Sequence, residues 1–274
     1  MNAAGDAATS RAARPRPDYG LDAPPVVRNL LLAGAAGLVL WLGAAVRLWS
    51  GDIRVPLGGD TLRIVFAPAA LSIGLTCLAM AAWMVWSSKV GKVRERERLL
   101  DTLSWRGDEQ VLDVGCGRGL MLIGAARRLR AGRATGIDLW RREDLGGNVP
   151  DAALANAVAE GVRDRVTLET ADMRVLPFAD ASFDVILSQA AVHNVPEAAG
   201  RRVAVEEMAR VLRPGGTILL ADIRNLGEYA RELRVAGLDV SIEGSAVERA
   251  LLGVITFGAL RPGVVRARRA ARAG

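Results

Sequence analysis

A glycine turn flanked by two aspartates carries the strongest chemical signal in this chain. Asp113 ends an apolar run, and Gly115, Gly117 and Gly119 follow it with the spacing G-x-G-x-G. Glycine has no Cβ, so the backbone of such a turn can approach a ligand closely and admit a tightly packed helix. Asp138 lies nineteen positions beyond Gly119, at the end of the next predicted strand, where a carboxylate can bind two ribose hydroxyls. The pattern predicts a site for a nucleoside-containing ligand.

Further candidate site residues come at the ends of later strand-like runs. Asp172 and Met173 follow one run, and Ser188 and Gln189 end the next. His193, the only histidine, comes four residues later. Histidine is a common general base, so His193 can act as one, although a histidine that only hydrogen-bonds within its loop also fits. Asp172 has a similar alternative, which is to cap a turn.

Two neighbours of the glycine turn have plainer interpretations. Cys116 lies inside the turn, where we expect a small packing residue rather than a nucleophile. The segment 139–148, which begins with Leu139, is longer than a minimal strand–helix connection. It either covers the ligand or forms a plain surface loop. The two cysteines, Cys77 and Cys116, are too few for a disulfide framework or a four-ligand zinc site, so we expect no metal.

The elements that position these residues alternate between strands and helices. Strands are predicted at 110–114, 135–138, 165–170, 183–188 and 217–222, with weaker candidates at 238–242 and 263–269. Helical patterns occupy 120–129, 151–162, 201–212 and 228–237, and the Arg-Pro-Gly-Gly sequence at 213–216 predicts a sharp stop and turn. Apolar strands that alternate with helices predict an α/β, doubly wound, mostly parallel sheet with helices on both faces.

Five motifs in this order resemble those of class I S-adenosylmethionine-dependent methyltransferases, and most closely the branch called methyltransferase type 11. The motifs occupy residues 111–119, 136–138, 171–173, 183–186 and 212–216. The resemblance spans roughly residues 95–260. It implies a Rossmann-like sheet of the seven-stranded type and S-adenosyl-L-methionine as the methyl donor.

The resemblance also implies a role for each candidate residue. Asp113 and the backbone of the glycine turn would hold the methionyl part of the donor, and Asp138, with Leu139 beside it, the ribose. Asp172 and the Met173 backbone would face the adenine. The methyl-transfer site would be lined by Ser188 and Gln189. Transfer from a sulfonium requires mainly alignment and exclusion of water, so a base such as His193 is needed only where the acceptor must lose a proton.

Two uncharged apolar segments precede this domain. Residues 29–46 and 64–88 contain no charged side chain, and about 20 apolar residues are enough to cross the hydrocarbon core of a membrane. Four of the six tryptophans fall in or beside these segments, as interfacial anchors do. We predict a transmembrane helical hairpin over 28–88, with helices at about 29–48 and 64–88, rather than a signal peptide or a buried core helix.

Basic residues around the hairpin predict its orientation. Residues 89–98 contain five basic and two acidic side chains, and four arginines precede the first apolar segment: Arg11, Arg14, Arg16 and Arg28. The loop between the segments has three arginines, so the positive-inside rule places both termini on the cytoplasmic side of the inner membrane. We expect a flexible tail over 1–27, a basic amphipathic linker helix over 89–104 and the methyltransferase domain over 105–274.

The charge balance argues against nucleic acid as the main partner. The chain has a net charge of +6, yet residues 99–260 contain 19 basic and 23 acidic side chains. A nucleic-acid-binding face needs positive charge spread over a folded surface, whereas here it lies in the flanks, where it suits anionic headgroups of a bilayer.

These observations favour a membrane-anchored methyltransferase with a small, apolar or lipidic acceptor on the cytoplasmic side. A membrane-neighbouring protein is the alternative acceptor. Two other classes remain open: a non-catalytic sensor that binds S-adenosylmethionine, and a nicotinamide-dependent oxidoreductase. Methyl turnover distinguishes the sensor from the enzyme, and stabilisation by S-adenosylmethionine rather than by NAD(P) excludes the oxidoreductase.

Overall fold

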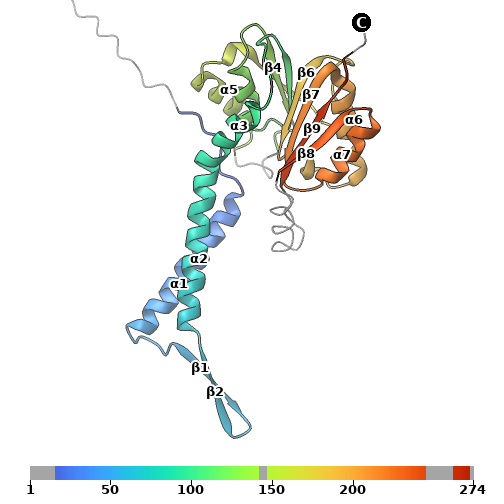
Figure 1. Cartoon of the computed structure of the whole chain (residues 1–274). Coiled ribbons are helices and arrows are strands. Elements are labelled where there is room, and N and C mark those ends of the chain that lie inside the picture. The colour runs from blue at the N-terminus through green and yellow to red at the C-terminus, as the bar shows by residue number, and fades with distance from the viewer. Residues whose placement is uncertain (1–15, 142–146, 245–261, 272–274) are drawn as a thin grey trace, which may run out of the picture.

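The computed structural model describes residues 16–141, 147–244 and 262–271. An α/β domain lies at one end of the molecule, and a helical hairpin projects from it (Figure 1). Several positions used in the sequence predictions lie outside the described residues, namely Arg11, Arg14 and residues 142–146 of the predicted cofactor loop.

The projecting hairpin consists of α1 (Pro24–Ala45) and α2 (Ala67–Trp86). Glycines bring the two helix backbones together, since a Cβ added at Gly37 would lie 2.6 Å from the carbonyl oxygen of Ala70. By length and composition both helices suit a membrane span, and the second candidate span continues to Leu100. Only 22% and 11% of their most apolar windows are buried, which is unlike core helices of a soluble domain.

The connection between these helices contains a β-hairpin that the sequence did not predict. β1 (Asp52–Leu57) and β2 (Asp60–Val65) pair antiparallel around Gly58 and Gly59. Both glycines have positive φ, +53° and +107°, which permits a two-residue turn. As a result, α2 begins at Ala67 rather than near residue 64.

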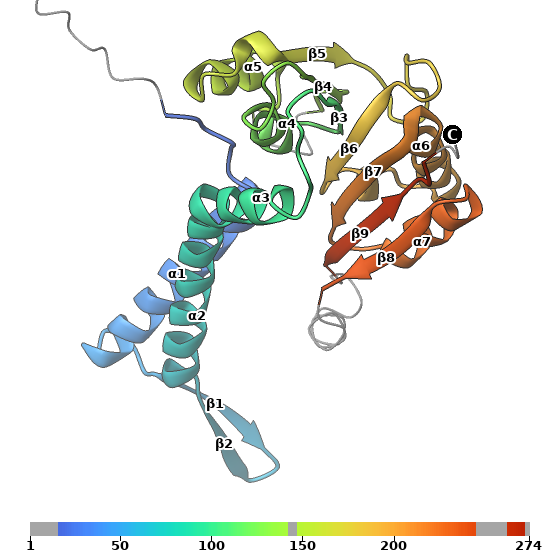
Figure 2. The same cartoon turned by 45° about the horizontal axis from the view of Figure 1, so that its top comes forward.

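A π-helical turn, η1 (Ser87–Gly91), joins α2 to α3 (Lys92–Leu100). Such turns bend helices, and α3 runs across the direction of α2 (Figure 2). α3 buries Leu99 and Leu100 against the domain. The predicted linker helix over 89–104 therefore corresponds to η1 and α3, and it ends at Leu100.

The domain is built on a seven-stranded sheet in the order β5-β4-β3-β6-β7-β9-β8. Its strands are β3 (Gln110–Val114), β4 (Arg133–Asp138), β5 (Val166–Thr170), β6 (Phe183–Gln189), β7 (Leu212–Asp222), β8 (Asp239–Glu243) and β9 (Gly263–Arg268). β3 to β7 pair in parallel, and β9 is antiparallel to both β7 and β8. The mostly parallel sheet of the predicted Rossmann-like fold is confirmed, including its two weaker strands.

Helices cover both faces of this sheet. They are α4 (Leu120–Ala126), α5 (Pro150–Ala159), α6 (Ala198–Val211) and α7 (Leu226–Val235), with short 3₁₀ turns η2 (Arg163–Arg165) and η3 (Val192–Asn194). One apolar cluster joins the sheet to α6 and α7 through residues such as Met208 and Tyr229. The other joins it to α3 and α4 through residues such as Leu100 and Leu122.

The Arg-Pro-Gly-Gly sequence differs from its prediction, because it lies inside β7 rather than in a separate turn. Phe183 pairs with Leu212 but Val185 pairs with Thr217, so β7 bulges between these two positions. Gly215 has a φ of +81°, and its N–H donates to the carbonyl oxygen of Arg269 at 3.1 Å. The bulge is thus stabilised by the chain that follows β9.

The described end of the N-terminal tail also differs from the predicted flexible segment. Residues 18–23, called the strap below, pack on the domain: Tyr19 is 5% exposed, and the Asp18 N–H donates to Asn156 Oδ1 at 2.8 Å. Lys92 of α3 donates to the carbonyl oxygens of Tyr19 and Gly20 at 2.8 and 3.0 Å. The start of the membrane-length hairpin is therefore fixed to the domain.

Candidate functional site

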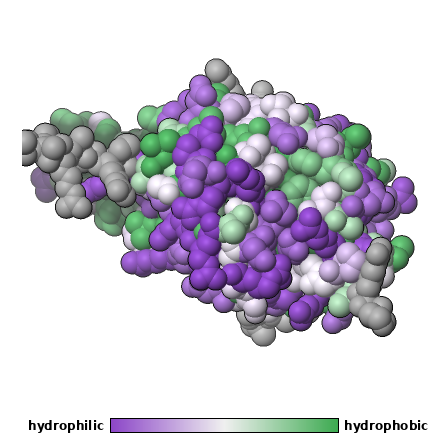
Figure 3. All heavy atoms as spheres, turned by 90° about the horizontal axis from the view of Figure 1, so that it is seen from above, coloured by the Kyte–Doolittle hydropathy of each residue, from purple (hydrophilic) through white to green (hydrophobic). Residues whose placement is uncertain are grey.

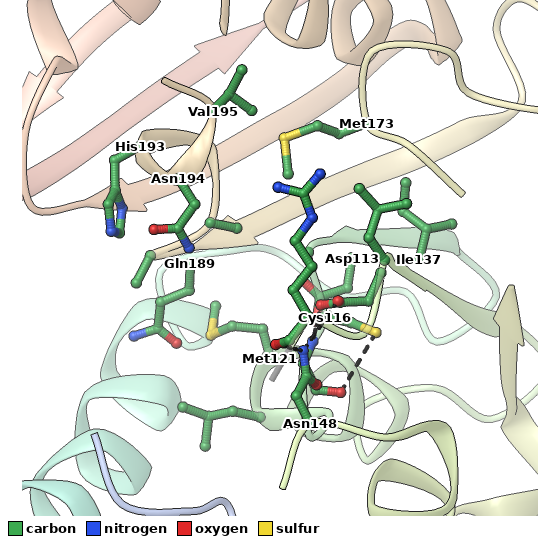
Figure 4. Close-up of a pocket in the computed structure, with 18 of the residues that line it drawn as sticks. Asp113, Cys116, Met121, Ile137, Asn148, Met173, Gln189, His193, Asn194 and Val195 are labelled. Carbon is green, nitrogen blue, oxygen red and sulfur yellow. Dashed lines mark hydrogen bonds between the residues drawn. The ribbon is translucent and has the colours of Figure 1, made fainter. Parts of the chain in front are cut away.

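A cavity of about 720 Å³ lies at the carboxyl ends of β3, β4 and β6 (Figure 4). This edge of a parallel sheet is where α/β folds bind ligands, and the volume is in the range of roughly 300–1,000 Å³ typical of ligand sites. Nine predicted site residues line the cavity: Asp113, Gly115, Gly117, Asp138, Leu139, Asp172, Met173, Gln189 and His193.

The glycine turn forms one wall of the cavity. Gly115 has a φ of +73°, and a Cβ there would lie 2.3 Å from the Cβ of Ala191, so only glycine fits. The Gly117 N–H donates to Asp138 Oδ2 at 2.8 Å, which ties the turn to the end of β4. Gly119 has a φ of +83° and precedes α4, so it shapes the helix start as the sequence indicates.

Cys116 fits the packing role. Its sulfur occupies space beside Gly136, where a Cβ would lie only 2.7 Å from Sγ. Burial raises the pKa of its thiol well above the ordinary value, and the nearby Asp113 and Asp138 charges raise it further. A thiol held neutral in this way is a poor nucleophile.

Asp113 is a buried carboxylate behind the turn. Its Oδ2 accepts a hydrogen bond from the Leu122 N–H at 2.8 Å. The pKa of this carboxyl is raised to about 7, mainly by burial and to a lesser extent by the Asp138 charge, and the hydrogen bond from Leu122 opposes both. A cationic ligand group nearby would favour the ionised form, so this position suits an ammonium.

Asp138 closes β4 and is held by three donors. Besides the Gly117 N–H, it accepts from the Trp140 N–H at 2.6 Å and from Asn148 Nδ2 at 3.2 Å. The Asn148 Oδ1 is buried with no hydrogen-bond partner in the described parts of the chain. Asn148 lines the cavity, and its place in the 139–148 loop is the one sequence feature that could have pointed to it.

Asp172 combines the two alternatives considered for it. It lines the cavity, and it also accepts from the Arg174 N–H at 2.9 Å, as a turn-capping aspartate does. The Arg174 guanidinium contacts its Oδ2 at 2.6 Å and lowers the pKa of the carboxyl. Met173 lies beside it in the cavity wall (Figure 4).

Ser188 and Gln189 point in different directions. Ser188 differs from its prediction: it is buried and its hydroxyl donates to the Val114 carbonyl oxygen at 2.8 Å, so it ties β6 to β3 rather than facing the cavity. Side chains alternate along a strand, so its neighbour Gln189 faces the cavity instead. The Gln189 Oε1 is buried and has no partner among residues 16–141, 147–244 and 262–271.

His193 belongs to a hydrogen-bonded pair with a residue that the sequence did not indicate. Its Nδ1 lies 2.5 Å from Asp222 Oδ1, and the Asp222 side chain is fully buried at the end of β7. Asp222 also accepts from the Ile223 N–H at 2.7 Å and the Tyr229 hydroxyl at 3.3 Å. An ionised carboxylate accepts the Nδ1 proton, so Nε2 of a neutral imidazole is left as an acceptor. Only the position of Asp222 at the end of a strand could have drawn attention to it.

The strap completes the cavity from outside the domain. Tyr19, Asp22, Ala23 and Lys92 line it together with the glycine turn. Lys92 Nζ also contacts Asp22 Oδ1 at 3.0 Å, and Arg96 of α3 donates to the Tyr19 hydroxyl at 2.9 Å. The residues that join the hairpin to the domain are therefore also cavity residues.

The cavity fits S-adenosylmethionine by its chemistry. A glycine-rich turn lies against the buried Asp113, and within the described ranges the buried amide oxygens of Gln189 and Asn148 have no hydrogen-bond partner, so they can accept from a ligand. Such unpaired acceptors are costly in a folded protein and suit a ligand that carries ammonium, hydroxyl and amine donors.

Comparison with known proteins agrees with this assignment. Residues 112–220 match a family model described as a methyltransferase domain. The chain is 36% identical over 172 residues to the 27-O-demethylrifamycin SV methyltransferase of Amycolatopsis mediterranei, covering 53% of this chain and 60% of that protein. It is 31% identical over 137 residues to a ubiquinone/menaquinone biosynthesis C-methyltransferase of Roseobacter denitrificans, covering 50% and 51%. The chain thus spans about half the length of the curated relatives it matches.

A solved structure shows the same fold. The YcgJ protein of Bacillus subtilis superposes with a TM-score of 0.52 at 18% identity, over 65% of this chain and 99% of that one. Residues 112–220 of the chain therefore match a methyltransferase domain, and the α/β domain shares its fold with YcgJ.

Proposed function

We propose that this chain is a membrane-anchored, S-adenosylmethionine-dependent methyltransferase that acts on a small, apolar or lipidic acceptor at the cytoplasmic face. One observation carries the proposal: the strap and Lys92 form part of the wall of the cofactor-type cavity. The strap leads directly into α1, and Lys92 follows α2 through η1. A site built at the root of an anchor meets membrane-dissolved molecules at high effective concentration.

The surface of the molecule supports this orientation. Hydrophilic side chains predominate on the face of the domain turned away from the hairpin (Figure 3). The carboxyl ends of β6 and β7 point instead toward α3, on the side from which the hairpin leaves (Figure 2). Together with the basic residues that flank the apolar helices, this supports a domain on the cytoplasmic side with its site near the bilayer.

Each residue then has a mechanistic role. When bound, S-adenosylmethionine supplies an activated methyl group on a sulfonium. Asp113 and the glycine turn bind the methionyl part, and Asp138 binds the ribose. Asp172 and Met173 border the adenine, and Gln189 accepts a hydrogen bond near the transfer site. His193 Nε2 takes a proton from the acceptor, while Asp222 holds the Nδ1 proton and the ring orientation.

Labelled methyl transfer tests the proposal. The full chain in phospholipid nanodiscs is incubated with methyl-labelled S-adenosylmethionine and a bacterial lipid extract. We expect label in an organic-soluble product, and we expect Asp138→Ala to abolish both label and thermal stabilisation by the donor, whereas Asp239→Ala on the exposed end of β8 changes neither. Tight donor binding without any labelled product would instead support the sensor alternative, and stabilisation by NAD(P) alone would support the oxidoreductase.

The membrane topology has its own test. Thr61→Cys lies in the β1–β2 hairpin, and Val235→Cys lies at the exposed end of α7. In intact cells a membrane-impermeant maleimide should label the first variant and not the second, with the unaltered chain as the background control. Labelling of both, or of the α7 position alone, would contradict the proposed orientation.

A further inference from the structure

A second cavity, of about 400 Å³, adjoins the cofactor-type cavity. Gln189, Ala190 and Ile223 line both, so they form the partition between them. The second cavity lies between α3 and the β7–β9 edge of the sheet. Apart from Gln189 and Asp222, the residues that line it have no role in the mechanism given above.

The inner wall of the second cavity is mostly apolar, although the buried carboxyl of Asp222 and the amide of Gln189 also line it, and charged side chains stand at its rim. Leu99, Ala221, Ile223 and Val264 supply the apolar surface. Three charged side chains stand at its rim: Glu95, Arg98 and Glu243. These charges are already paired, because Arg98 Nε contacts Glu95 Oε2 at 2.7 Å and Arg266 Nε contacts Glu243 Oε1 at 2.6 Å. The cavity thus suits a hydrocarbon group rather than a charged one.

The position of this cavity connects it with the anchor. Its α3 wall continues from α2 through η1, and the second membrane-length helix is counted from Ala67 to Leu100. Leu99, in the cavity wall, lies in α3, which follows α2 directly after the bend at η1. A cavity in this place suits a molecule that leaves the bilayer, because its hydrocarbon part can pass from the lipid to the apolar walls without being exposed to water.

Two polar features point across the partition. The buried Gln189 Oε1 has no partner in the described structure and lies where the two cavities meet. His193 lines the first cavity, whereas its partner Asp222 lines the second. A hydroxyl placed at the partition could donate to Gln189 or to His193 Nε2, and the group attached to it would extend toward the apolar walls.

We propose that the second cavity is the acceptor subsite, and that it holds the hydrocarbon part of an amphipathic alcohol or phenol. The hydroxyl of this acceptor lies at the partition, beside Gln189 and His193. This inference rests on the proposed function and names its substrate class. In the transfer, the acceptor O–H bond breaks and its proton goes to His193 Nε2. The oxygen forms the new O–CH₃ bond as the methyl–sulfur bond breaks, and that electron pair stays on sulfur. The products are a methyl ether, S-adenosylhomocysteine and a proton, which His193 later releases to water.

Photolabelling tests the location of the acceptor directly. The probe is a 4-alkylphenol with a diazirine in its alkyl chain, added to the full chain in nanodiscs with S-adenosylhomocysteine present. We expect label on peptides that contain Leu99, Ile223 or Val264, and competition by 4-octylphenol. Label confined to α1 and α2, or to the outer surface of the domain, would overturn the proposal.

A filling substitution provides the matched binding test. Ala221→Phe places a ring in the second cavity, and Val235→Phe, 79% exposed on α7, is the control. We expect the Kd for 4-octylphenol to rise about tenfold or more in the first variant only, because several CH₂ groups lose their apolar site. The Kd for S-adenosylmethionine should stay within about twofold.

The two levels of the proposal fail differently. If the Ala221→Phe variant loses S-adenosylmethionine binding, its fold has changed. Ile223→Ala is then tested in its place, and because it enlarges the cavity it should bind bulkier alkylphenols more tightly than wild type does. If wild-type protein methylates a lipid acceptor but neither variant alters alkylphenol binding, the subsite is wrong while the enzyme assignment stands. If no acceptor is methylated, the proposed function itself fails.

Discussion

Neutralising Asp113 should stabilise the protein and at the same time impair cofactor binding. The carboxyl is buried and its pKa is raised from 3.8 to about 7, so at pH 8 the folded state must hold a charge that burial disfavours. A shift of about 3 pH units corresponds to about 4 kcal/mol at about 1.4 kcal/mol per unit. Asp113→Asn removes this cost and keeps an oxygen to accept from the Leu122 N–H. The NH₂ group of the new asparagine has no partner, which costs about 1–3 kcal/mol, so the free energy of unfolding at pH 8 should rise by about 2 kcal/mol.

The sign of the pH dependence follows from the same shift. Between pH 4 and 7 the folded state binds more protons than the unfolded state, so the stability of the wild type falls as pH rises through this window. The neutral variant lacks this dependence. Its advantage should therefore be largest at pH 8, whereas near pH 4 only the cost of the unpaired amide donor remains and the variant should be less stable than wild type by about 1–3 kcal/mol. A gain of about 2 kcal/mol corresponds to roughly 4–8 °C in Tm for a domain of this size.

Thermal unfolding in nanodiscs, with and without S-adenosylmethionine, measures both effects. Asp172→Asn is the control for unfolding without the donor, because the pKa of Asp172 is lowered by Arg174 and its neutralisation should cost up to about 1 kcal/mol at pH 8 rather than stabilise. We expect the Asp113 variant to melt higher than wild type and to gain little from the donor. A variant that melts lower at pH 8, or that the donor stabilises as much as wild type, would refute the reasoning.

Three further predictions concern the strap, the base and the hairpin. Lys92→Met should weaken S-adenosylmethionine binding about tenfold by calorimetry, because it frees the strap, whereas Lys89→Met, which breaks an exposed contact with Asp18, should have little effect. His193→Ala should lower kcat about 10²–10⁴-fold with an unchanged donor Kd, and unchanged turnover would exclude a base role. Gly37→Leu should push α1 from α2 and lower the thermal stability of the nanodisc-embedded protein by about 1–3 kcal/mol without altering donor affinity; an unchanged Tm would argue against the close crossing.

The sequence predicted the parts of the fold that depend on local patterns. Strand periodicity and the glycine spacing located the sheet and the turn. Gly115 has the positive φ and the close contact that a glycine in such a motif predicts. The weaker strands β8 and β9 were also found. Their pairing, with β9 inserted between β7 and β8, depends on contacts far apart in the chain and is not encoded in periodicity.

The missed features are all tertiary. The strap has the composition of a loop, and only its contacts with Lys92 and Asn156 make it a cavity wall. Asp222 resembles any strand-terminal aspartate until β7 brings it beside His193. Ser188 and Gln189 are adjacent in sequence, and the alternation of side chains along β6 decides which of them faces the cavity.

The most direct test of the central claim is methyl transfer by the full chain in a lipid bilayer. Nanodisc-embedded protein receives methyl-labelled S-adenosylmethionine and a lipid extract, and the organic-soluble products are separated and identified by mass spectrometry. The membrane-anchored methyltransferase proposed here predicts one labelled, organic-soluble species, present with wild type and absent with Asp138→Ala. Saturating donor binding with no labelled small molecule or lipid would contradict it.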